Sequence, residues 1–198
     1  MGEIRSAWEM ALERTKDIKS DPQAVKAHEA KNRGKRLVAK LLDDPDFDLK
    51  KALKQEPKEE IKWVKEGLFS IIQSSIILPK GNADLTRFDQ LAEILGSVAS
   101  DRRAIQNTTS QIRQFLSQYL EDRNQVIEYL RQQYSSRLRQ REEQLSQQYG
   151  TPVKLDPSSD PEFSNAIQDN LSKLDRQYQD GLTQAKQHLE QLFQSTIR

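Results

Sequence analysis

The chain lacks several residue types on which common protein chemistries depend. Its 198 residues include no cysteine, two histidines, seven glycines and seven prolines. Without cysteine, the chain has no disulfides, no thiolate nucleophiles and no zinc–cysteine sites. The small number of glycines and prolines excludes collagen-like and loop-dominated architectures.

Long hydrophobic runs are also scarce. The most apolar stretch, Gly67 to Leu78, spans twelve residues, whereas a helix that crosses a membrane needs about 20. The N-terminal segment is amphipathic and does not follow the pattern of a signal peptide. We therefore expect a cytoplasmic protein with no membrane span.

The chain is rich in charged residues, and their charges nearly cancel. Lysine and arginine number 31 against 30 aspartates and glutamates, and charged residues make up 31% of the chain. The mean hydropathy is −0.85. Disordered chains usually combine low hydropathy with a large net charge, whereas balanced charge at low hydropathy is typical of long helices with solvent-exposed faces.

Aspartate–proline pairs predict where helices begin. An aspartate side chain accepts hydrogen bonds from the free N–H groups of a first turn, and proline suits the first helical position. This pattern occurs at Asp21-Pro22, Asp44-Pro45 and Asp160-Pro161. The periodicity of the first half predicts helices over about residues 4–18, 22–42, 45–55 and 58–78. The last of these is apolar on all sides in its second half, which places it in the middle of a bundle.

Small residues indicate two further local features. Ala27, Ala30 and Gly34 lie on one face of the helix predicted over 22–42, where they would let another backbone approach closely. The segment from Gly96 to Asp101 is a candidate break in the helical pattern, with Ser100 as the cap of the helix that follows.

The clearest pattern in the chain is an eleven-residue period of apolar side chains. The residues at this spacing are Ile94, Ile105, Leu116, Ile127, Leu138 and Tyr149. Eleven residues in three turns is 3.67 residues per turn, so the apolar stripe runs nearly straight along its helix or coils slightly to the right. The stretch from Phe163 to Thr196 repeats this pattern with steps of four, four and three residues.

These two periodic stretches predict an elongated, coiled-coil-like antiparallel hairpin over residues 101–198, with an N-terminal helical part over 1–100. Residues 101–149 and 162–198 would be the two helices of the hairpin, joined by a turn at 150–160. Because the first helix is longer, we expect its N-terminal part to pack on a first-half helix or on a second copy, and we predict a homodimer. The candidate interaction residues are Ile105, Leu116, Ile127, Leu138 and Tyr149.

The acidic run from Asp43 to Asp48 looks like the start of a calcium loop. Counted from Asp44, positions 6 and 12 of such a loop require glycine and glutamate, but they hold Leu49 and Gln55. We interpret the run as a helix start with acidic side chains at its positive end, and weak binding of a divalent ion stays open. Neither histidine has a glutamate three residues before it, which excludes the Glu-x-x-His pairs of di-metal bundle enzymes. We therefore expect no catalytic residue, no metal and no cofactor.

A basic segment supports an alternative function. Residues 26–40 carry six lysines and arginines against Glu29 alone, and such a segment could meet phosphates. The candidate basic patch consists of Lys31, Arg33, Lys35 and Arg36. Nucleic-acid-binding domains usually show a strong basic excess, whereas the net charge of this chain is +1. Nucleic acid is therefore the second choice of partner.

The start of the chain carries a resemblance. Residues 1–6 (MGEIRS), with ALERT at 11–15, resemble the start of a set of uncharacterised helical bacterial proteins. That resemblance implies a bacterial, cytoplasmic origin and no site. The eleven-residue period and the helices rich in glutamine and arginine are similar in pattern to the peripheral-stalk subunits of rotary ATPases, whose C-terminal α/β domain this sequence does not contain.

Together these features predict an all-α protein with an N-terminal bundle and a long hairpin. We expect a non-enzymatic structural or protein–protein interaction module that binds through the exposed stripes of its long helices, as helices do in grooves. Nucleic-acid binding through residues 26–40 is the alternative, and an unrecognised helical-bundle enzyme comes third.

Overall fold

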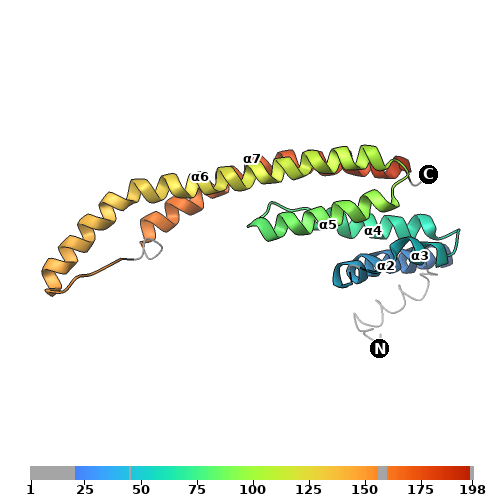
Figure 1. Ribbon diagram of the computed structural model, residues 1–198, viewed down its shortest axis with the longest axis horizontal. Helices are drawn as coiled ribbons and strands as arrows, with labels where there is room; N and C mark the ends of the chain where they lie inside the picture. The colour runs from blue at the N-terminus through green and yellow to red at the C-terminus, as the bar shows by residue number, and fades with distance from the viewer. Residues whose placement is uncertain (1–20, 45, 156–159, 197–198) are drawn as a thin grey trace, which may run out of the picture. The chain divides into compact units, whose positions relative to one another are not determined.

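The computed structural model describes residues 21–44, 46–155 and 160–196, which form helices joined by short connections (Figure 1). The helices are α2 (Pro22–Asp43), α3 (Leu49–Gln55), α4 (Ile61–Ser75), α5 (Asn82–Val98), α6 (Arg102–Tyr149) and α7 (Pro161–Thr196). No strand occurs within these described ranges, and the predicted all-α fold is confirmed. The helix expected over residues 4–18 lies outside them.

Two of the three aspartate–proline pairs begin helices as predicted. Asp21 is the N-cap of α2, and its carboxylate accepts from the backbone N–H of Gln23 at 3.0 Å. Asp160 precedes α7 and accepts from the backbone N–H of Glu162 at 2.9 Å. Local capping chemistry is therefore sufficient to place these two helix starts.

Two other helix starts differ from the prediction. Asp44 is the C-cap of α2, and α3 begins only after Asp48, whose carboxylate accepts from the N–H of Lys51 at 2.9 Å. The break expected near residues 96–101 is present, but its cap is Asp101 and not Ser100. An ionised carboxylate is the stronger acceptor for the N–H groups of a first turn, which accounts for the choice of Asp101.

The chain divides into two compact units, residues 1–71 and 72–198. A division after residue 100, as we predicted it, would lie between α5 and α6. These two helices pack on each other. Asp89 on α5 accepts from the Arg113 guanidinium on α6 at 2.9 Å. Because α5 packs against α6, it belongs to the same unit as the hairpin.

In the first unit, α2 and α4 cross at two glycines. A Cβ atom added to Gly34 would lie 1.9 Å from the carbonyl oxygen of Val64, and one added to Gly67 would lie 2.0 Å from the carbonyl oxygen of Lys31. Ala30, one turn before Gly34, is fully buried. The predicted close approach of a second backbone to α2 is thus confirmed, and glycine is required because any side chain would collide with the backbone of the other helix.

In the second unit, α7 runs antiparallel along α6, and α5 packs on the N-terminal part of α6 (Figure 1). We expected either a first-half helix or a second copy to pack on the N-terminal part of α6. The structure has a first-half helix, α5, at this place. The end of the longer helix that α7 does not cover is its C-terminal end, where Ser146 and Glu142 accept from the backbone N–H groups of Val153 and Leu155. The Arg141 guanidinium lies 3.5 Å from Asp160, the residue just before α7, so the last turns of α6 extend beyond its partner.

The eleven-residue period is realised along the part of α6 that α7 covers, up to the level at which α7 begins. Ile105, Leu116 and Leu138 are at most 7% exposed, and Ile127 is half-buried. Tyr149 lies beyond the reach of α7 and is 65% exposed. The step from Ile94 to Ile105 is a coincidence of spacing, because the helix break at residues 99–101 separates the two.

Candidate functional site

Two tyrosine–aspartate pairs fix the register of the α6–α7 hairpin. Tyr119 on α6 donates to Asp175 on α7 at 2.7 Å, and Tyr178 on α7 donates to Asp122 on α6. The two rings meet edge to face with centroids 5.2 Å apart, and Tyr178 also packs on Phe115 at 4.9 Å. Because the two hydrogen bonds run in opposite directions between the same helices, a slip of either helix would break both.

The same pairs alter the titration of their members. Burial, and then the neighbouring Asp175 carboxylate, raise the pKa of Tyr119 to about 12. Burial and Asp122 raise the pKa of Tyr178 to about 12. The hydrogen bonds from Tyr178 and Gln118 hold the pKa of Asp122 below its ordinary value. Both tyrosines therefore stay protonated donors, and Asp122 stays an ionised acceptor, near neutral pH.

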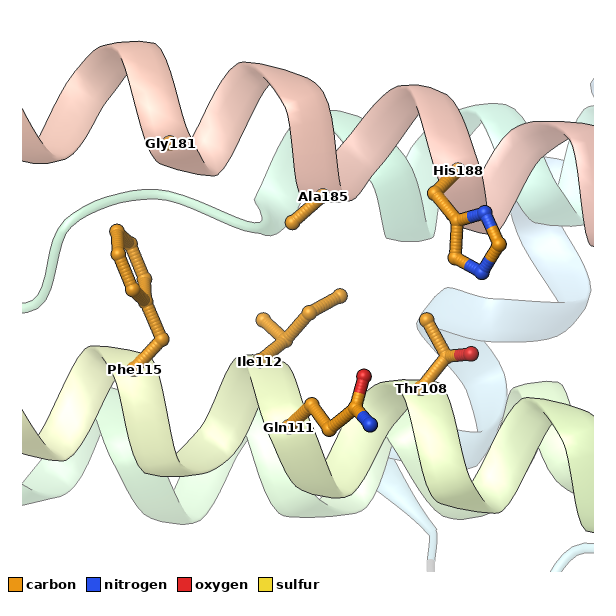
Figure 2. A pocket seen from close by; sticks show the side chains of 7 residues that line it. All are labelled: Thr108, Gln111, Ile112, Phe115, Gly181, Ala185 and His188. Atoms are coloured by element: carbon orange, nitrogen blue, oxygen red, sulfur yellow. The ribbon is translucent and has the colours of Figure 1, made fainter.

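Next to this pair a groove opens between α6 and α7 (Figure 2). Its volume is about 220 Å³. We call it the α6–α7 groove, and it is lined by Thr108, Gln111, Ile112, Phe115, Gly181, Ala185 and His188. Figure 2 shows Thr108, Ile112 and Phe115 of α6 directed towards α7, which carries only small residues at Gly181 and Ala185. The groove exists because two consecutive turns of α7 have almost no side chain to fill it.

The groove has an apolar floor and a polar rim. Ile112 is 2% exposed and Thr108 7% exposed, while Phe115 is half-buried. Gln111 and His188 are exposed at the edge. An apolar hollow with a few polar groups around it suits the insertion of an apolar or aromatic side chain that carries a polar tip.

Gly181 has a packing role beside this groove. A Cβ atom at this position would lie 3.0 Å from Cζ of Phe115, which is tighter than ordinary van der Waals contact. Gly181 thus lets the Phe115 ring lie against α7, and the ring forms one end of the groove. No sequence motif pointed to this site, and the available signal was the pair of small residues four positions apart on a helix otherwise rich in large side chains.

Exposed glutamines extend from the groove along α6. Gln118 and Gln125 follow the groove residue Gln111 at intervals of seven residues, and all three are exposed. Residues seven apart lie on nearly the same face of a helix. We call Gln111, Gln118 and Gln125 the glutamine strip. It gives this face of α6 a polar surface, in which the Asp122 carboxylate accepts from the Gln118 amide at 2.8 Å.

The five predicted interaction residues do not form one exposed stripe on α6. Ile105, Leu116 and Leu138 are buried within the chain, and Ile127 is half-buried. Of the five candidates, Tyr149 alone is exposed. The apolar period therefore marks the internal contact of the hairpin, and the surface that remains free lies beside it, on the glutamine strip and at the groove.

The basic patch is partly neutralised within the first unit. The Lys31 ammonium lies 3.1 Å from Glu66. The Arg33 guanidinium donates to Glu56 at 2.8 Å and also to Glu60. Lys35 and Arg36 are exposed. Two of the four residues predicted to contact phosphates are thus paired with carboxylates, Lys31 with one on α4 and Arg33 with two from the connection between α3 and α4.

The acidic run at 43–48 caps backbone groups. The carboxylate of Asp44 accepts from the N–H of Asp46 at 3.1 Å, and Asp48 caps α3. Across the described residues, histidine, aspartate and glutamate side chains form no group of three or more that could hold a metal ion.

A half-buried lysine ties α7 to the segment that follows α4. The Lys186 ammonium donates to the carbonyl oxygen of Ile76 at 3.1 Å, just past the end of α4. Burial lowers the pKa of Lys186. One turn further along α7, Glu190 accepts from the Gln73 amide at 3.0 Å. These polar contacts hold the side of α7 that faces away from the groove.

Comparison with known proteins adds a family and no function. Within the described ranges, none of the helices combines the length and the apolar character needed to cross a membrane. No curated protein and no solved structure matches the chain. A family model described as a family of unknown function (DUF6657) matches residues 50–191. The match includes the whole groove and the glutamine strip and begins after the basic patch and the N-terminal resemblance. Since it covers more than half of the sequence, the chain belongs to this family of unknown function.

Proposed function

We propose that this chain is a non-enzymatic protein–protein interaction module that binds its partner at the α6–α7 groove. The observation that carries the proposal is the groove itself, an apolar hollow of about 220 Å³ with polar groups at its rim. A partner helix that lies along the hairpin would insert one apolar or aromatic side chain into it. Such buried anchor side chains supply most of the binding energy of helix-in-groove contacts.

The construction of the hairpin supports this function. The tyrosine–aspartate pairs hold α6 and α7 at one register next to Phe115, which forms an end of the groove. A surface that is already ordered before binding loses less conformational entropy on association. The groove is therefore suited to bind with little rearrangement.

The surroundings of the groove also suit a protein partner. Charged residues are depleted at the centres of protein interfaces, whereas aromatic residues are enriched there. The glutamine strip beside the groove is exposed, and the Asp122 carboxylate on the same face already accepts from Gln118 and Tyr178. The homodimer and the cytoplasmic location that we expect from the sequence are parts of this proposal.

Nucleic-acid binding has weaker support. Lys31 and Arg33 are paired with carboxylates, so phosphates would have to compete for them. The exposed Lys35 and Arg36 are the remaining candidates. A gel shift whose strength falls with added salt and is lost on replacing these two residues by alanine would favour nucleic acid over a protein partner.

Filling the groove tests the proposed function. Ala185→Leu places a larger side chain in the hollow at a half-buried position, and Ala83→Leu makes the same change at an exposed position of α5. Proteins captured from cell lysate by the wild type and by Ala83→Leu, but not by Ala185→Leu, are identified and then measured as purified proteins. Equal capture by all three chains contradicts binding at the groove. Circular dichroism of each variant checks that its helices are intact.

A further inference from the structure

The α6–α7 groove has an apolar end and a polar end. Figure 2 shows Phe115 at one end of the groove and Thr108 and His188 at the other. Gln111 follows Thr108 by three residues, and side chains at this spacing are neighbours on the surface of a helix. The polar end therefore brings together a hydroxyl and a carboxamide from α6 and an imidazole from α7.

These three polar side chains have no partner within the described part of the chain. Thr108, Gln111 and His188 form neither a hydrogen bond nor an ion pair there. The neighbouring Thr109 differs, because its hydroxyl donates to the carbonyl oxygen of Ile105 at 2.9 Å. Among the described residues every buried side-chain nitrogen and oxygen has a partner. The unpartnered Thr108 hydroxyl must therefore reach the surface of the groove, although the residue is only 7% exposed.

The charges around the polar end permit an anionic ligand. The residues that line the groove include no aspartate, glutamate, lysine or arginine. Asp101 caps the start of α6, and Glu190 accepts from the Gln73 amide. Asp180, about two turns before His188 on α7, is exposed. An anionic group at the polar end would meet possible donors from both helices, and no carboxylate among the lining residues would repel it.

The two ends together define what an inserted group must carry. A wholly apolar side chain would leave the hydroxyl, the amide and the imidazole buried without partners, which costs free energy. Each of these three groups can donate a hydrogen bond, and a carboxylate can accept up to about four through its two oxygens. Because the donors lie on both helices, one oxygen can face α6 while the other faces α7.

We propose that the residue inserted into the groove is the C-terminal residue of the partner chain, with its carboxylate at the polar end and an apolar or aromatic side chain at the apolar end. The carboxylate and the side chain of a terminal residue branch from one Cα atom. Thr108 and the apolar Ile112 are four residues apart, about 6 Å along α6, so one residue can reach both. Capture of a C-terminal carboxylate is a recurring mode of peptide recognition. This inference rests on the proposed function and names the chemistry of its partner.

The rim of the groove favours a chain terminus over a free acid. Gln177 and Gln184 are exposed on α7 and lie four residues before and three residues after the groove residue Gly181. On α6, the exposed Gln111 begins the glutamine strip. A carboxamide both donates and accepts, as each peptide group of a backbone does. These amides therefore suit the backbone of a peptide that leads out of the groove.

Peptides that differ only at their terminus test the carboxylate. The acetylated tripeptide alanyl-leucyl-phenylalanine is titrated into the isotope-labelled full chain, once as the free acid and once as the C-terminal amide, and both dissociation constants are measured by NMR. Because hydrogen bonds to a charged group are the stronger ones, the amide should bind at least about tenfold more weakly. Hydrocinnamate has the same ring and a carboxylate but no peptide backbone for the rim amides, so it should also bind at least about tenfold more weakly.

Two neighbouring threonines supply matched variants. Thr108→Val and Thr109→Val each replace a buried hydroxyl by a methyl group, but only Thr108 lines the groove. Thr108→Val and His188→Ala should each weaken binding of the free-acid peptide about three- to tenfold and binding of the amide by less. A purely structural role would weaken both peptides equally. Thr109→Val should change neither affinity by more than about twofold, and circular dichroism checks the helices of each variant.

The outcomes separate this inference from the proposed function. Equal affinity for the acid and the amide overturns the inference, as does a free-acid peptide that does not bind at its highest soluble concentration. Hydrocinnamate that binds as tightly as the peptide also overturns it, because a free aromatic acid would then be the ligand. The proposed function fails separately, when Ala185→Leu captures the same proteins as its control. Where capture does depend on the groove, a purified partner that still binds after deletion of its last residue refutes this inference alone.

Discussion

The rings of Tyr119 and Tyr178 meet edge to face with centroids 5.2 Å apart, and each hydroxyl donates to an aspartate on the helix of the other ring. The arrangement joins an aromatic contact and two hydrogen bonds at one level of the α6–α7 hairpin. It lies next to the groove because Tyr178 also packs on Phe115. The stability of the hairpin and the shape of the candidate site therefore depend on the same side chains.

Removal of one hydroxyl should destabilise the fold. Tyr119→Phe keeps the ring and deletes the donor to Asp175. A hydrogen bond to a charged group is worth about 1.5–3 kcal/mol, less where water replaces the lost partner. Since Asp175 is half-buried, we expect a loss of about 1 kcal/mol in the free energy of unfolding, measured by urea denaturation. A change indistinguishable from zero would mean that the pair does not secure the register.

The second pair should make stability depend on pH. Tyr178 holds the pKa of Asp122 below its ordinary value of 3.8. A carboxylate with a lowered pKa in the folded state stabilises the fold above its unfolded pKa, and that contribution is lost as the pH falls through the folded pKa. The difference in unfolding free energy between the wild type and Tyr178→Phe should therefore be largest near neutral pH and shrink below about pH 4. A difference that is constant with pH would contradict this linkage.

The crossing of α2 and α4 should not tolerate a methyl group. Gly34→Ala would place a Cβ atom 1.9 Å from the carbonyl oxygen of Val64, so the two backbones must separate. We expect a loss above about 3 kcal/mol, as for other strongly overpacked positions. Gly96→Ala is the control, for which we expect a gain in the free energy of unfolding instead of a loss. Its Cβ would meet only side-chain atoms at 3.8 Å or more, and alanine inside a helix gains about 0.5–1 kcal/mol over glycine. Similar effects at both sites would refute the close crossing.

Positions along the apolar stripe of α6 should differ in their sensitivity. Leu116 is 2% exposed, and Leu116→Ala should cost about 2–5 kcal/mol. Ile127 is half-buried, so Ile127→Ala should cost less. Ile127→Asp should be more destabilising than Ile127→Ala and than the control Arg131→Ala, which is exposed and should stay within about 0.5 kcal/mol. If Ile127→Asp is as mild as the control, position 127 faces solvent.

The end of α6 requires a left-handed residue. Gly150 is its C-cap with φ at 66°, a region that costs a residue with a Cβ atom about 1–2 kcal/mol. Gly150→Ala should therefore lower stability by about 1 kcal/mol, and Gly150→Asn by less, because asparagine tolerates this conformation. Thermal unfolding followed by circular dichroism measures both. Equal melting temperatures for the three chains would show that the turn does not depend on this residue.

The candidate site was only partly predictable. The period of eleven correctly indicated which face of α6 is apolar, but burial of Leu116 and Leu138 takes that face out of the surface available to partners. The groove depends on Gly181 and Ala185 meeting Ile112 and Phe115 across the hairpin. Their separations along the chain are large, and a pattern within one helix carries no information about the side chains of another.

The sequence by itself determined the features that arise within one helix. Asp21 and Asp160 predicted two helix starts because a capping hydrogen bond spans only two or three residues, and apolar spacing predicted long helices because periodicity is a local property. The tertiary structure alone decided which surfaces meet. It selected α5 as the second partner of α6, left the C-terminal end of α6 uncovered by α7, and opened a groove where small residues of α7 face α6. Those outcomes follow from packing between segments far apart in the chain, where shape and volume are matched between helices rather than along one.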